Sequence, residues 1–407
     1  MQKKNLLLLC DNYPLNNGEF FIDDEMKIIA GRFNKIFIIT NKPIINNSAR
    51  EYPDNAEIFY LPILDCSKLK SFFLIFSKLF IFELFNALTK QKIKISFLML
   101  KIILNDLSRA ILLKKTIETI LQKNSNTILY SYWHDYKALT IAMLSEQDKH
   151  QVSLARAHRW DIYFEENEFP YLPFKNFMVK NLTMTYCISE DGKNSLLKRV
   201  GENLNHKIKV SKLGKSNNYL LNNLKTKDSY IICSCSSLTS VKRVNQIVEI
   251  LSKVKTKNIT WYHFGDGPLI DEISTLAKNQ LTNCEYKLQG FVSNNDILKF
   301  YNEIYVDLFL NVSESEGIPV SIMEAQSAGI PVFATNVGGN KEIVNNTNGY
   351  IFDKNFNINK IAEQIDSFLS APAIDILLIR DNALNNWKEN YCAEKNYNDF
   401  FISINSL

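Results

Sequence analysis

Short apolar segments alternate with longer amphipathic segments along both halves of the chain. In the first half the apolar segments have the length of buried strands, and they cover residues 5–10, 35–40, 58–63, 127–133, 152–158 and 184–189. In the second half the corresponding segments are 231–237, 259–265, 285–290, 306–312, 331–335 and 350–352. Alternation of such strands with helical patterns is typical of a mostly parallel sheet covered on both faces. The pattern predicts two α/β domains.

Three segments depart from this alternation. Residues 67–123 predict a helical insert that is strongly apolar and carries eleven Lys/Arg against three Asp/Glu. Such helices either cover the sheet or lie in an anionic membrane interface, and both interpretations stay open. The polar stretch 215–228 predicts a linker between an N-terminal domain, 1–214, and a C-terminal domain, 229–380. The aromatic segment 381–407 predicts a closing helix.

Composition excludes several classes of protein. The 407 residues are 46% hydrophobic and 22% charged, with a net charge of +4, so no charge extreme indicates a nucleic-acid partner. The seven cysteines are scattered, and the close pair Cys233 and Cys235 lies within a predicted strand, which indicates reduced thiols in the cytosol. The first residues do not form a signal peptide. No uncharged apolar run reaches the roughly 18 residues of a spanning helix.

The stretch 311–335, NVSESEGIPVSIMEAQSAGIPVFAT, contains two glutamates at the predicted boundary of a strand and a helix. Glu316 lies in the loop, and Glu324 lies about one turn into a helix that Pro319 opens and Gly329 ends. Carboxylates at such a position either accept hydrogen bonds from sugar and ribose hydroxyl groups or are surface charges.

Backbone N–H groups at the start of the same helix suit a diphosphate. In open α/β sheets, ligands bind beyond the carboxyl ends of the strands, near helix N-termini. The candidate donors belong to Gly317, Ile318 and the first helical turn, which starts at Pro319 and Val320.

Other loops in the second half follow their strands at a similar depth. The segment SSLTSVKR, residues 236–243, places Lys242 and Arg243 near a helix start, where a cation neutralises a diphosphate or is simply solvated. The turn HFGDGPL contains Gly265 and Asp266 and suits close approach to a base or ribose, or is only a turn. The paired glycines at 338 and 339 allow a tight bend.

The first half offers fewer candidates. Gly18 follows the first predicted strand and precedes a helical pattern, which is either a phosphate-approaching loop or an ordinary turn. His134 in SYWHDY and His158 in ARAHRWDIY end predicted strands, and Asp161 lies just beyond. No metal-ligand spacing, hydrolase nucleophile motif or Walker loop is present.

The segments EGIPVSIMEAQSAGIPVFAT, GG.KEIV, NGYIF, FGDGP, SSLTSVKR, WHDY and AHRWDIY together resemble the retaining family 4 glycosyltransferases of the GT-B fold. The resemblance is closest to bacterial enzymes that build capsular, exopolysaccharide or O-antigen chains. It is strong over residues 185–355 and looser before them. The spacing of the two glutamates, with its Gly-x-Pro context, is its most specific part.

The resemblance implies two Rossmann-like domains facing a cleft, with a closing helix that crosses back to the first domain. It also implies roles for particular residues: Glu316 beside the donor sugar, Glu324 on ribose hydroxyls, Lys242 on the diphosphate, Gly18 near the phosphates and His158 near the transferred sugar. One departure is Ser237, which stands where the family often has arginine, and Arg243 is a candidate to replace that charge. His134 and Asp161 are further candidates for the cleft or the acceptor.

These features predict a metal-independent glycosyltransferase without a cofactor, whose donor is a UDP- or GDP-sugar. The expected acceptor is a glycan or lipid-linked glycan, the expected location is the cytoplasm or the inner face of the plasma membrane, and an anionic membrane surface is a candidate partner. Two alternatives stay open: a sugar-nucleotide epimerase on the same fold, and a non-catalytic nucleotide-sugar-binding partner in a polysaccharide assembly complex.

Overall fold

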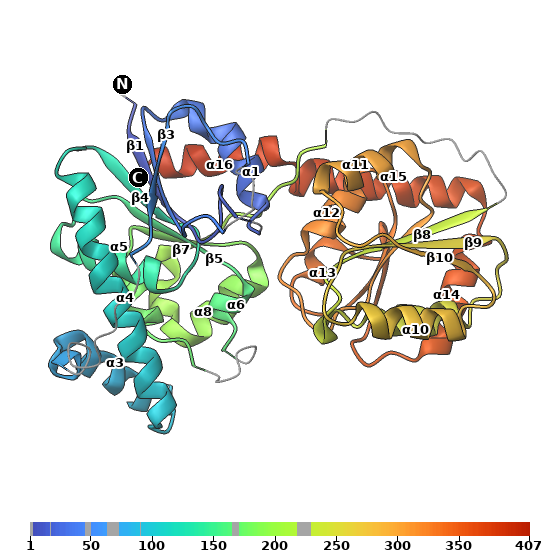
Figure 1. Ribbon diagram of the computed structural model, residues 1–407, viewed down its shortest axis with the longest axis horizontal. Coiled ribbons are helices and arrows are strands. Elements are labelled where there is room, and N and C mark those ends of the chain that lie inside the picture. Colours follow the sequence, from blue (N-terminus) through green and yellow to red (C-terminus); the bar gives the residue numbers. More distant parts are fainter. Residues whose placement is uncertain are drawn as a thin grey trace. The chain divides into compact units, whose positions relative to one another are not determined.

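The computed structural model describes residues 3–16, 18–44, 50–62, 73–89, 91–164, 171–217 and 229–407. The chain divides into two compact units (Figure 1): one comprises Met1–Lys212 with Tyr397–Leu407, and the other comprises Leu213–Asn396. The chain therefore passes from one unit to the other twice, once before Leu213 and once before Tyr397.

The first unit is built on a seven-stranded sheet in the order β3-β2-β1-β4-β5-β6-β7, in which every pairing is parallel. Its strands are β1 (Asn5–Leu9), β2 (Ile36–Thr40), β3 (Ala56–Tyr60), β4 (Thr127–Ser131), β5 (Ser153–Ala157), β6 (Met184–Cys187) and β7 (Ile208–Val210). The central strands are buried on both faces, which explains their unbroken apolar sequences. The short edge strand β7 was not predicted, because only Ile208 of its three residues is buried.

Helices cover both faces of this sheet (Figure 1). They are α1 (Phe21–Ile29), α3 (Lys78–Thr89), α4 (Phe97–Leu121), α5 (Tyr136–Gln147), α6 (Arg159–Ile162), α7 (Lys175–Asn181), α8 (Glu190–Val200) and α16 (Ala393–Asn405), with 3-10 turns η1 (Ala30–Arg32), η2 (Phe73–Phe76) and η4 (Glu202–Lys207). The predicted insert, residues 67–123, contains η2, α3 and α4, and its first residues, 67–72, lie outside the described ones. The buried face of α4 contributes Met99, Ile103 and Leu107 to the core beneath the sheet.

The second unit contains a parallel six-stranded sheet in the order β10-β9-β8-β11-β12-β13. Its strands are β8 (Tyr230–Cys235), β9 (Ile259–Phe264), β10 (Glu285–Leu288), β11 (Leu308–Asn311), β12 (Val332–Thr335) and β13 (Gly349–Phe352). Its helices are α9 (Val244–Leu251), α10 (Ile270–Gln280), α11 (Asn294–Glu303), α12 (Val320–Ser327), α13 (Asn340–Ile343), α14 (Ile358–Leu369) and α15 (Ala373–Asn390), with the 3-10 turn η5 (Ser240–Lys242). The prediction of two α/β domains with parallel sheets is thereby confirmed.

The C-terminal segment differs from the single helix predicted over 381–407. Helix α15 already begins at Ala373, and a break at Tyr391 and Cys392 separates it from α16. The break coincides with backbone pairing to Lys215, whose N–H donates to Tyr391 O at 2.9 Å and whose carbonyl accepts from the Trp387 indole at 3.0 Å. The start of the predicted linker is therefore fixed to this break, while residues 218–228 lie outside the described ones.

Candidate functional site

Glu316 lies in the loop between β11 and α12, at the carboxyl edge of the second sheet. Its Oε1 accepts hydrogen bonds from Lys242 Nζ at 2.6 Å, Ser313 Oγ at 2.6 Å and Asn311 Nδ2 at 3.3 Å. The side chain is 8% exposed, so little water competes with these donors. Three donors on one oxygen hold the carboxylate in a single orientation and offset the cost of burying its charge.

Helix α12 begins directly beyond this carboxylate, as predicted. Pro319 is the residue before the first helical turn, and Gly329, at φ +64°, follows the helix end. The N–H groups of Val320 and Ser321, at the start of the helix, have no intrahelical acceptor by the geometry of an α-helix. The positive end of the helix dipole thus lies beside the loop that carries Glu316, Gly317 and Ile318.

Lys242 ends the 3-10 turn η5, which follows β8, and its side chain is 22% exposed. It is the cation that the structure brings to Glu316. Ser237 lies in the loop between β8 and η5, and it is exposed. A cation and a carboxylate from two different strand loops therefore meet at one edge of the sheet.

Arg243 has a different environment from the neighbouring lysine. Its Nε donates to Val312 O at 2.8 Å, its Nη2 to Ser313 O at 3.1 Å and its Nη1 to Lys354 O at 3.1 Å. The guanidinium therefore ties three main-chain carbonyls together and supports the loop that follows β11. This gives Arg243 a structural task, and its predicted contact with a donor phosphate stays a prediction.

The paired glycines after β12 hold the Glu316 loop in place, a role that the sequence did not show. A Cβ on Gly338, whose φ is +48°, would lie 1.8 Å from Glu316 O, and a Cβ on Gly339 would lie 2.5 Å from Gly317 O. Gly339 N also donates to Gly317 O at 2.9 Å. Only glycine permits this approach of two backbones. The sequence shows the two adjacent glycines, but it does not show that they pack against the backbone of Glu316 and Gly317.

Glu324 lies on α12 and is 1% exposed. Its Oε1 accepts from Asn294 Nδ2 at 2.6 Å, and Lys215 Nζ lies 3.7 Å from the same oxygen. Neither Asn294 nor Lys215 was predicted as part of the site, because both are distant in sequence and belong to no motif. Burial makes Glu324 a positioned acceptor of hydrogen bonds rather than a surface charge, which was the alternative interpretation.

Gly265 and Asp266 form the turn after β9. At φ +136°, Gly265 approaches the β8 loop so closely that a Cβ would lie 1.9 Å from Ser236 O. Asp266 is exposed, and its carbonyl accepts from Leu238 N at 3.0 Å. The close approach predicted for this turn is therefore made by the protein's own backbone, and contact with a base or ribose stays a prediction.

In the first unit, one carboxylate joins the loops that carry both candidate histidines. Asp161 accepts from His134 N at 2.6 Å and from His158 N at 2.7 Å, and these residues follow β4 and β5. Burial raises the pKa of Asp161 to about 7, against the opposing effects of Lys175 and the two N–H donors. Asp161 thus fixes the two loops relative to each other.

Both histidines are buried and neutral. Burial, together with Arg156, lowers the pKa of His158 to about 3, and burial with Lys175 lowers the pKa of His134 well below its usual value. The His158 ring packs 4.5 Å from Trp133, and its buried Nε2 has no hydrogen-bond partner among the described residues. A neutral imidazole with an unused nitrogen suits a hydroxyl group better than an anion.

Gly18 precedes a carboxylate that fills the loop after β1. Glu19 accepts from the N–H groups of Asp11 at 3.0 Å, Asn12 at 2.5 Å and Tyr13 at 2.8 Å, and from the Trp133 indole. Consecutive N–H groups of this kind form a nest for an anion. The N–H groups of the loop after β1 are therefore occupied by the protein's own carboxylate. Contact of Gly18 with a donor stays a prediction.

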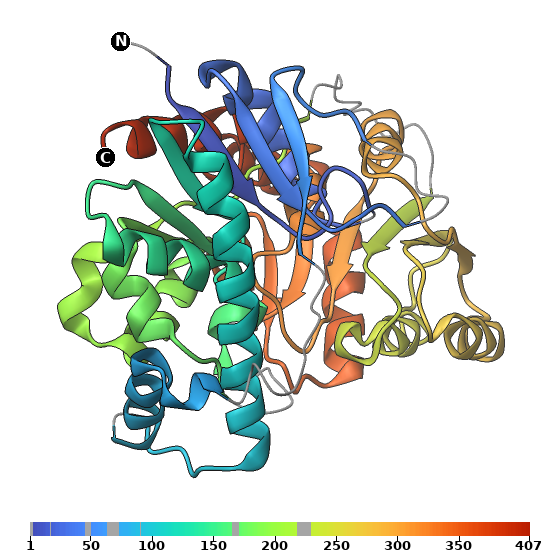
Figure 2. The same ribbon diagram turned by 60° about the vertical axis from the view of Figure 1, so that its left-hand side comes forward.

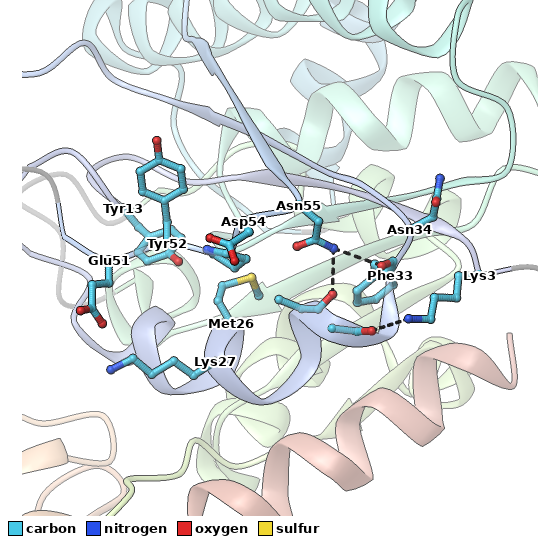
Figure 3. A pocket seen from close by; sticks show the side chains of 13 residues that line it. Lys3, Tyr13, Met26, Lys27, Phe33, Asn34, Glu51, Tyr52, Asp54 and Asn55 are labelled. Atoms are coloured by element: carbon cyan, nitrogen blue, oxygen red, sulfur yellow. Dashed lines mark hydrogen bonds between the residues drawn. The ribbon is translucent and has the colours of Figure 1, made fainter.

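One cavity of the first unit is not at these residues. It measures about 580 Å³ and lies along α1 in the first unit (Figure 3). Lys3 and Asn55 on its wall donate to the main-chain carbonyls of Gly31, Ala30 and Phe33. Its polar groups serve the fold, and its size alone indicates no chemistry.

The described residues contain neither a metal-binding cluster nor a helix that could span a membrane. No group of three or more His, Cys, Asp or Glu side chains there is placed to hold a metal ion. Neither does any helix within those ranges have the length and apolarity needed to cross a bilayer.

Most of the second unit is similar to a known family. Residues 218–391, which include Lys242, Glu316 and Glu324, match the family model of glycosyl transferases group 1. These residues make up most of the second unit, so that unit is similar to glycosyl transferases group 1. The resemblance inferred from the sequence is confirmed at the level of this group.

Two Escherichia coli proteins are relatives of this chain. The O-antigen biosynthesis glycosyltransferase WbnH is 29% identical over 186 residues, which are 42% of this chain and 50% of the relative. The UDP-Gal:alpha-D-GlcNAc-diphosphoundecaprenol alpha-1,3-galactosyltransferase is 30% identical over 139 residues, which are 34% of this chain and 32% of the relative. The chain spans half or less of the length of these relatives.

Solved structures resemble this chain over both units. Anabaena Alr3699/HepE in complex with UDP and glucose has a TM-score of 0.69 at 15% identity and covers 99% of this chain and 100% of that one. Sucrose-phosphate synthase from Thermosynechococcus elongatus has a TM-score of 0.72 at 12% identity and covers 99% of each chain. At these identities the likeness establishes the fold, which is GT-B, as predicted.

Proposed function

We propose that the chain is a retaining glycosyltransferase that moves a sugar from a nucleoside diphosphate sugar to a hydroxyl group of a lipid-linked glycan. The reaction belongs to the synthesis of a bacterial surface polysaccharide. The observation that carries the proposal is the part-buried contact between Lys242 and Glu316 near the start of α12, within the residues that match the glycosyl transferase family. The names of the E. coli relatives support the polysaccharide and the lipid diphosphate acceptor.

Charge development in the reaction explains the cation at this position. When the bond between the sugar and the diphosphate breaks, negative charge grows on the leaving phosphate. Lys242 and the N–H groups at the start of α12 would stabilise that charge. Lys242 is already paired with Glu316. It can bind the leaving phosphate only if Ser313 and Asn311 continue to hold the Glu316 carboxylate.

Glu316 would position the donor sugar and would not attack it. A nucleophilic carboxylate needs an accessible oxygen with electron density to spare. Oε1 receives three hydrogen bonds, one of them from a cation, and these withdraw electron density from the whole carboxylate and weaken it as a nucleophile. With retained configuration, the acceptor oxygen bonds to the anomeric carbon on the face from which the phosphate leaves, and the acceptor proton passes to the leaving phosphate oxygen. No metal ion or cofactor enters this scheme.

Glu324 would accept hydrogen bonds from the ribose hydroxyls of the donor. The carboxyl group is buried, lies beside Lys215 and is held by Asn294, so its remaining hydrogen-bonding capacity has a fixed direction. In the first unit, the neutral His158 would contact a sugar hydroxyl through its unused Nε2. The donor base and sugar depend on details of pocket shape that these contacts do not specify.

The test measures nucleoside diphosphate release from UDP-glucose, UDP-galactose, UDP-N-acetylglucosamine and GDP-mannose, with a lipid-linked acceptor and with excess EDTA. We expect release with one donor, and losses of about 10²- to 10³-fold in kcat for Lys242→Ala, as for other residues that stabilise a leaving group. Glu316→Gln should also lower kcat. The matched control is the exposed ion pair Lys299 and Glu303, whose removal should leave turnover unchanged.

The products separate the alternatives. NMR of the new glycosidic bond shows whether the donor configuration is retained. A changed sugar nucleotide without diphosphate release would indicate an epimerase, and binding without turnover on any acceptor would indicate a non-catalytic partner. Unchanged turnover in Lys242→Ala would refute the role given to the Lys242–Glu316 contact.

A further inference from the structure

Helix α3 in the first unit has the reverse of the usual polarity of a surface helix. Its polar side chains Glu83 and Asn86 are buried, and Tyr171 donates a hydrogen bond of 2.6 Å to Glu83 Oε1. Its opposite side carries Ile81, Phe82 and other large apolar residues in exposed positions. A helix in contact with water normally places its polar residues outward. The sequence of α3 therefore fits an apolar environment on its outer side.

The exposed apolar residues of α3 continue onto the neighbouring segments. We call the following set the apolar face: Phe73, Phe76, Ile81, Phe82, Phe85, Leu88, Ile95, Phe97 and Leu98. These nine lie within residues 73–98, and five of them are phenylalanines. Phe76 is 71% exposed and Phe97 is 85% exposed, so they pack against little of the described protein. The four residues on α3, at spacings i, i+1, i+4 and i+7, share one side of that helix, and such an exposed apolar side marks an interaction surface.

The apolar face lies on a projecting part of the first unit. Both ribbon views show α3 and the first turns of α4 extending away from the sheet of their own unit (Figures 1 and 2). The inner side of this part is anchored, because Phe80 and Ala87 of α3 and Met99 of α4 belong to the core of the unit. The outer side is thus held in a fixed orientation and is not a loose segment.

Charge around the apolar face has one sign. Lys78, Lys92, Lys94 and Lys101 are exposed beside it. Among the described residues from 73 to 101 the single acidic residue is Glu83, which is buried and faces inward. Lysines with an apolar surface, and without exposed carboxylates, complement anionic lipid headgroups. A second copy of the chain would instead bring these lysines together, which is unfavourable.

We propose that the apolar face and its lysines dock the first unit on an anionic lipid bilayer. The phenylalanine side chains enter the boundary between headgroups and acyl chains, and the lysine ammonium groups lie at the level of the lipid phosphates. The surface lies on the bilayer and does not cross it. This docking needs no donor or acceptor, but it would place the proposed transferase where a lipid-linked glycan is found.

The test is co-sedimentation of the full chain with vesicles of phosphatidylethanolamine and phosphatidylglycerol, and with vesicles of phosphatidylcholine alone. The perturbing variant is Ile81→Asp with Phe85→Asp, two exposed positions one helical turn apart. The matched control is Ile374→Asp with Leu378→Asp, a pair with the same spacing and similar exposure on α15 of the other unit. Circular dichroism and urea unfolding establish that each variant folds.

We expect wild type and control to bind the anionic vesicles, with partition falling as NaCl rises because the lysines are screened. Phosphatidylcholine vesicles should bind far less protein. The Ile81/Phe85 variant should bind at least tenfold less than the control, and Lys92→Glu with Lys94→Glu should lower binding and remove its salt dependence.

Several results would overturn the proposal. One is wild type remaining in the supernatant with anionic vesicles, and another is equal binding by the Ile81/Phe85 variant and its control. A wild-type dimer that becomes a monomer in this variant, without vesicle binding, would assign the face to a second copy of the chain. Because vesicle binding is measured without a nucleotide-sugar, failure here is distinct from failure of the proposed transfer reaction.

Discussion

Replacement of Glu19 by alanine tests whether its carboxylate organises the loop after β1. In the structure this side chain accepts from the N–H groups of Asp11, Asn12 and Tyr13 and from the Trp133 indole. Glu19 is 6% exposed, and its single carboxylate accepts from all four donors. Glu19→Ala removes the acceptor and leaves the donors in place.

The magnitude follows from the donors left without an acceptor. A buried N–H without a partner costs about 1–3 kcal/mol. Asp11 and Asn12 are half-buried, so water can reach part of the nest, while Tyr13 is buried. We therefore expect the free energy of unfolding to fall by about 3 kcal/mol, a large part of the roughly 5–15 kcal/mol typical of a domain.

Urea unfolding followed by circular dichroism measures this change, and Glu57→Ala on the edge strand β3 serves as the control, because its side chain is exposed. Acetate added to Glu19→Ala should bind in the vacated nest and restore part of the stability. Sodium chloride at the same ionic strength should not. A loss below about 1 kcal/mol, or equal recovery with chloride, would refute the assignment of Glu19 as the anion of this nest.

Four further predictions follow from other contacts. Gly338→Ala, which places a methyl group against Glu316 O, should abolish donor binding in isothermal titration calorimetry while the circular dichroism spectrum stays native. Burial raises the pKa of Glu83 to about 7, so below pH 7 the folded protein binds a proton that the unfolded chain does not yet bind. In urea unfolding, the free energy of unfolding of wild type should therefore rise by up to about 3 kcal/mol relative to Glu83→Gln as the pH falls from 8 to 4. The ring of His158, with a pKa lowered to about 3, should show no NMR titration between pH 5 and 8. Arg243→Lys, which cannot bridge three carbonyls, should lower the free energy of unfolding by about 1–3 kcal/mol.

The central strands of both sheets could be predicted because parallel strands buried on two faces have unbroken apolar sequences. Prediction failed where structure depends on distant pairing. Strand β7 is a three-residue edge with one buried side chain, which leaves no pattern. The break between α15 and α16 is set by the pairing of Cys392 with Lys215, which lies 177 residues earlier in the chain. The sequence around Cys392 alone predicts a continuous helix.

The candidate site was predictable where its residues belong to one motif. Glu316, Pro319 and Glu324 lie within a single loop and helix, so their relation follows from helical geometry. Asn294 and Lys215 could not be found, because they reach Glu324 from other elements. In physical terms, local spacing fixes which side of a helix a residue occupies, but only the folded chain determines which donors meet a carboxylate.

The two units treat an anion differently at the carboxyl edges of their sheets. In the first unit, the N–H groups after β1 are occupied by Glu19, a carboxylate tethered in the same loop and therefore present at high effective concentration. A diphosphate would have to displace it. In the second unit, Glu316 takes its hydrogen bonds from side chains, and the N–H groups at the start of α12 are not used by that carboxylate. We therefore expect the donor phosphates to depend on the second unit, and Gly18 to serve the turn that presents Glu19.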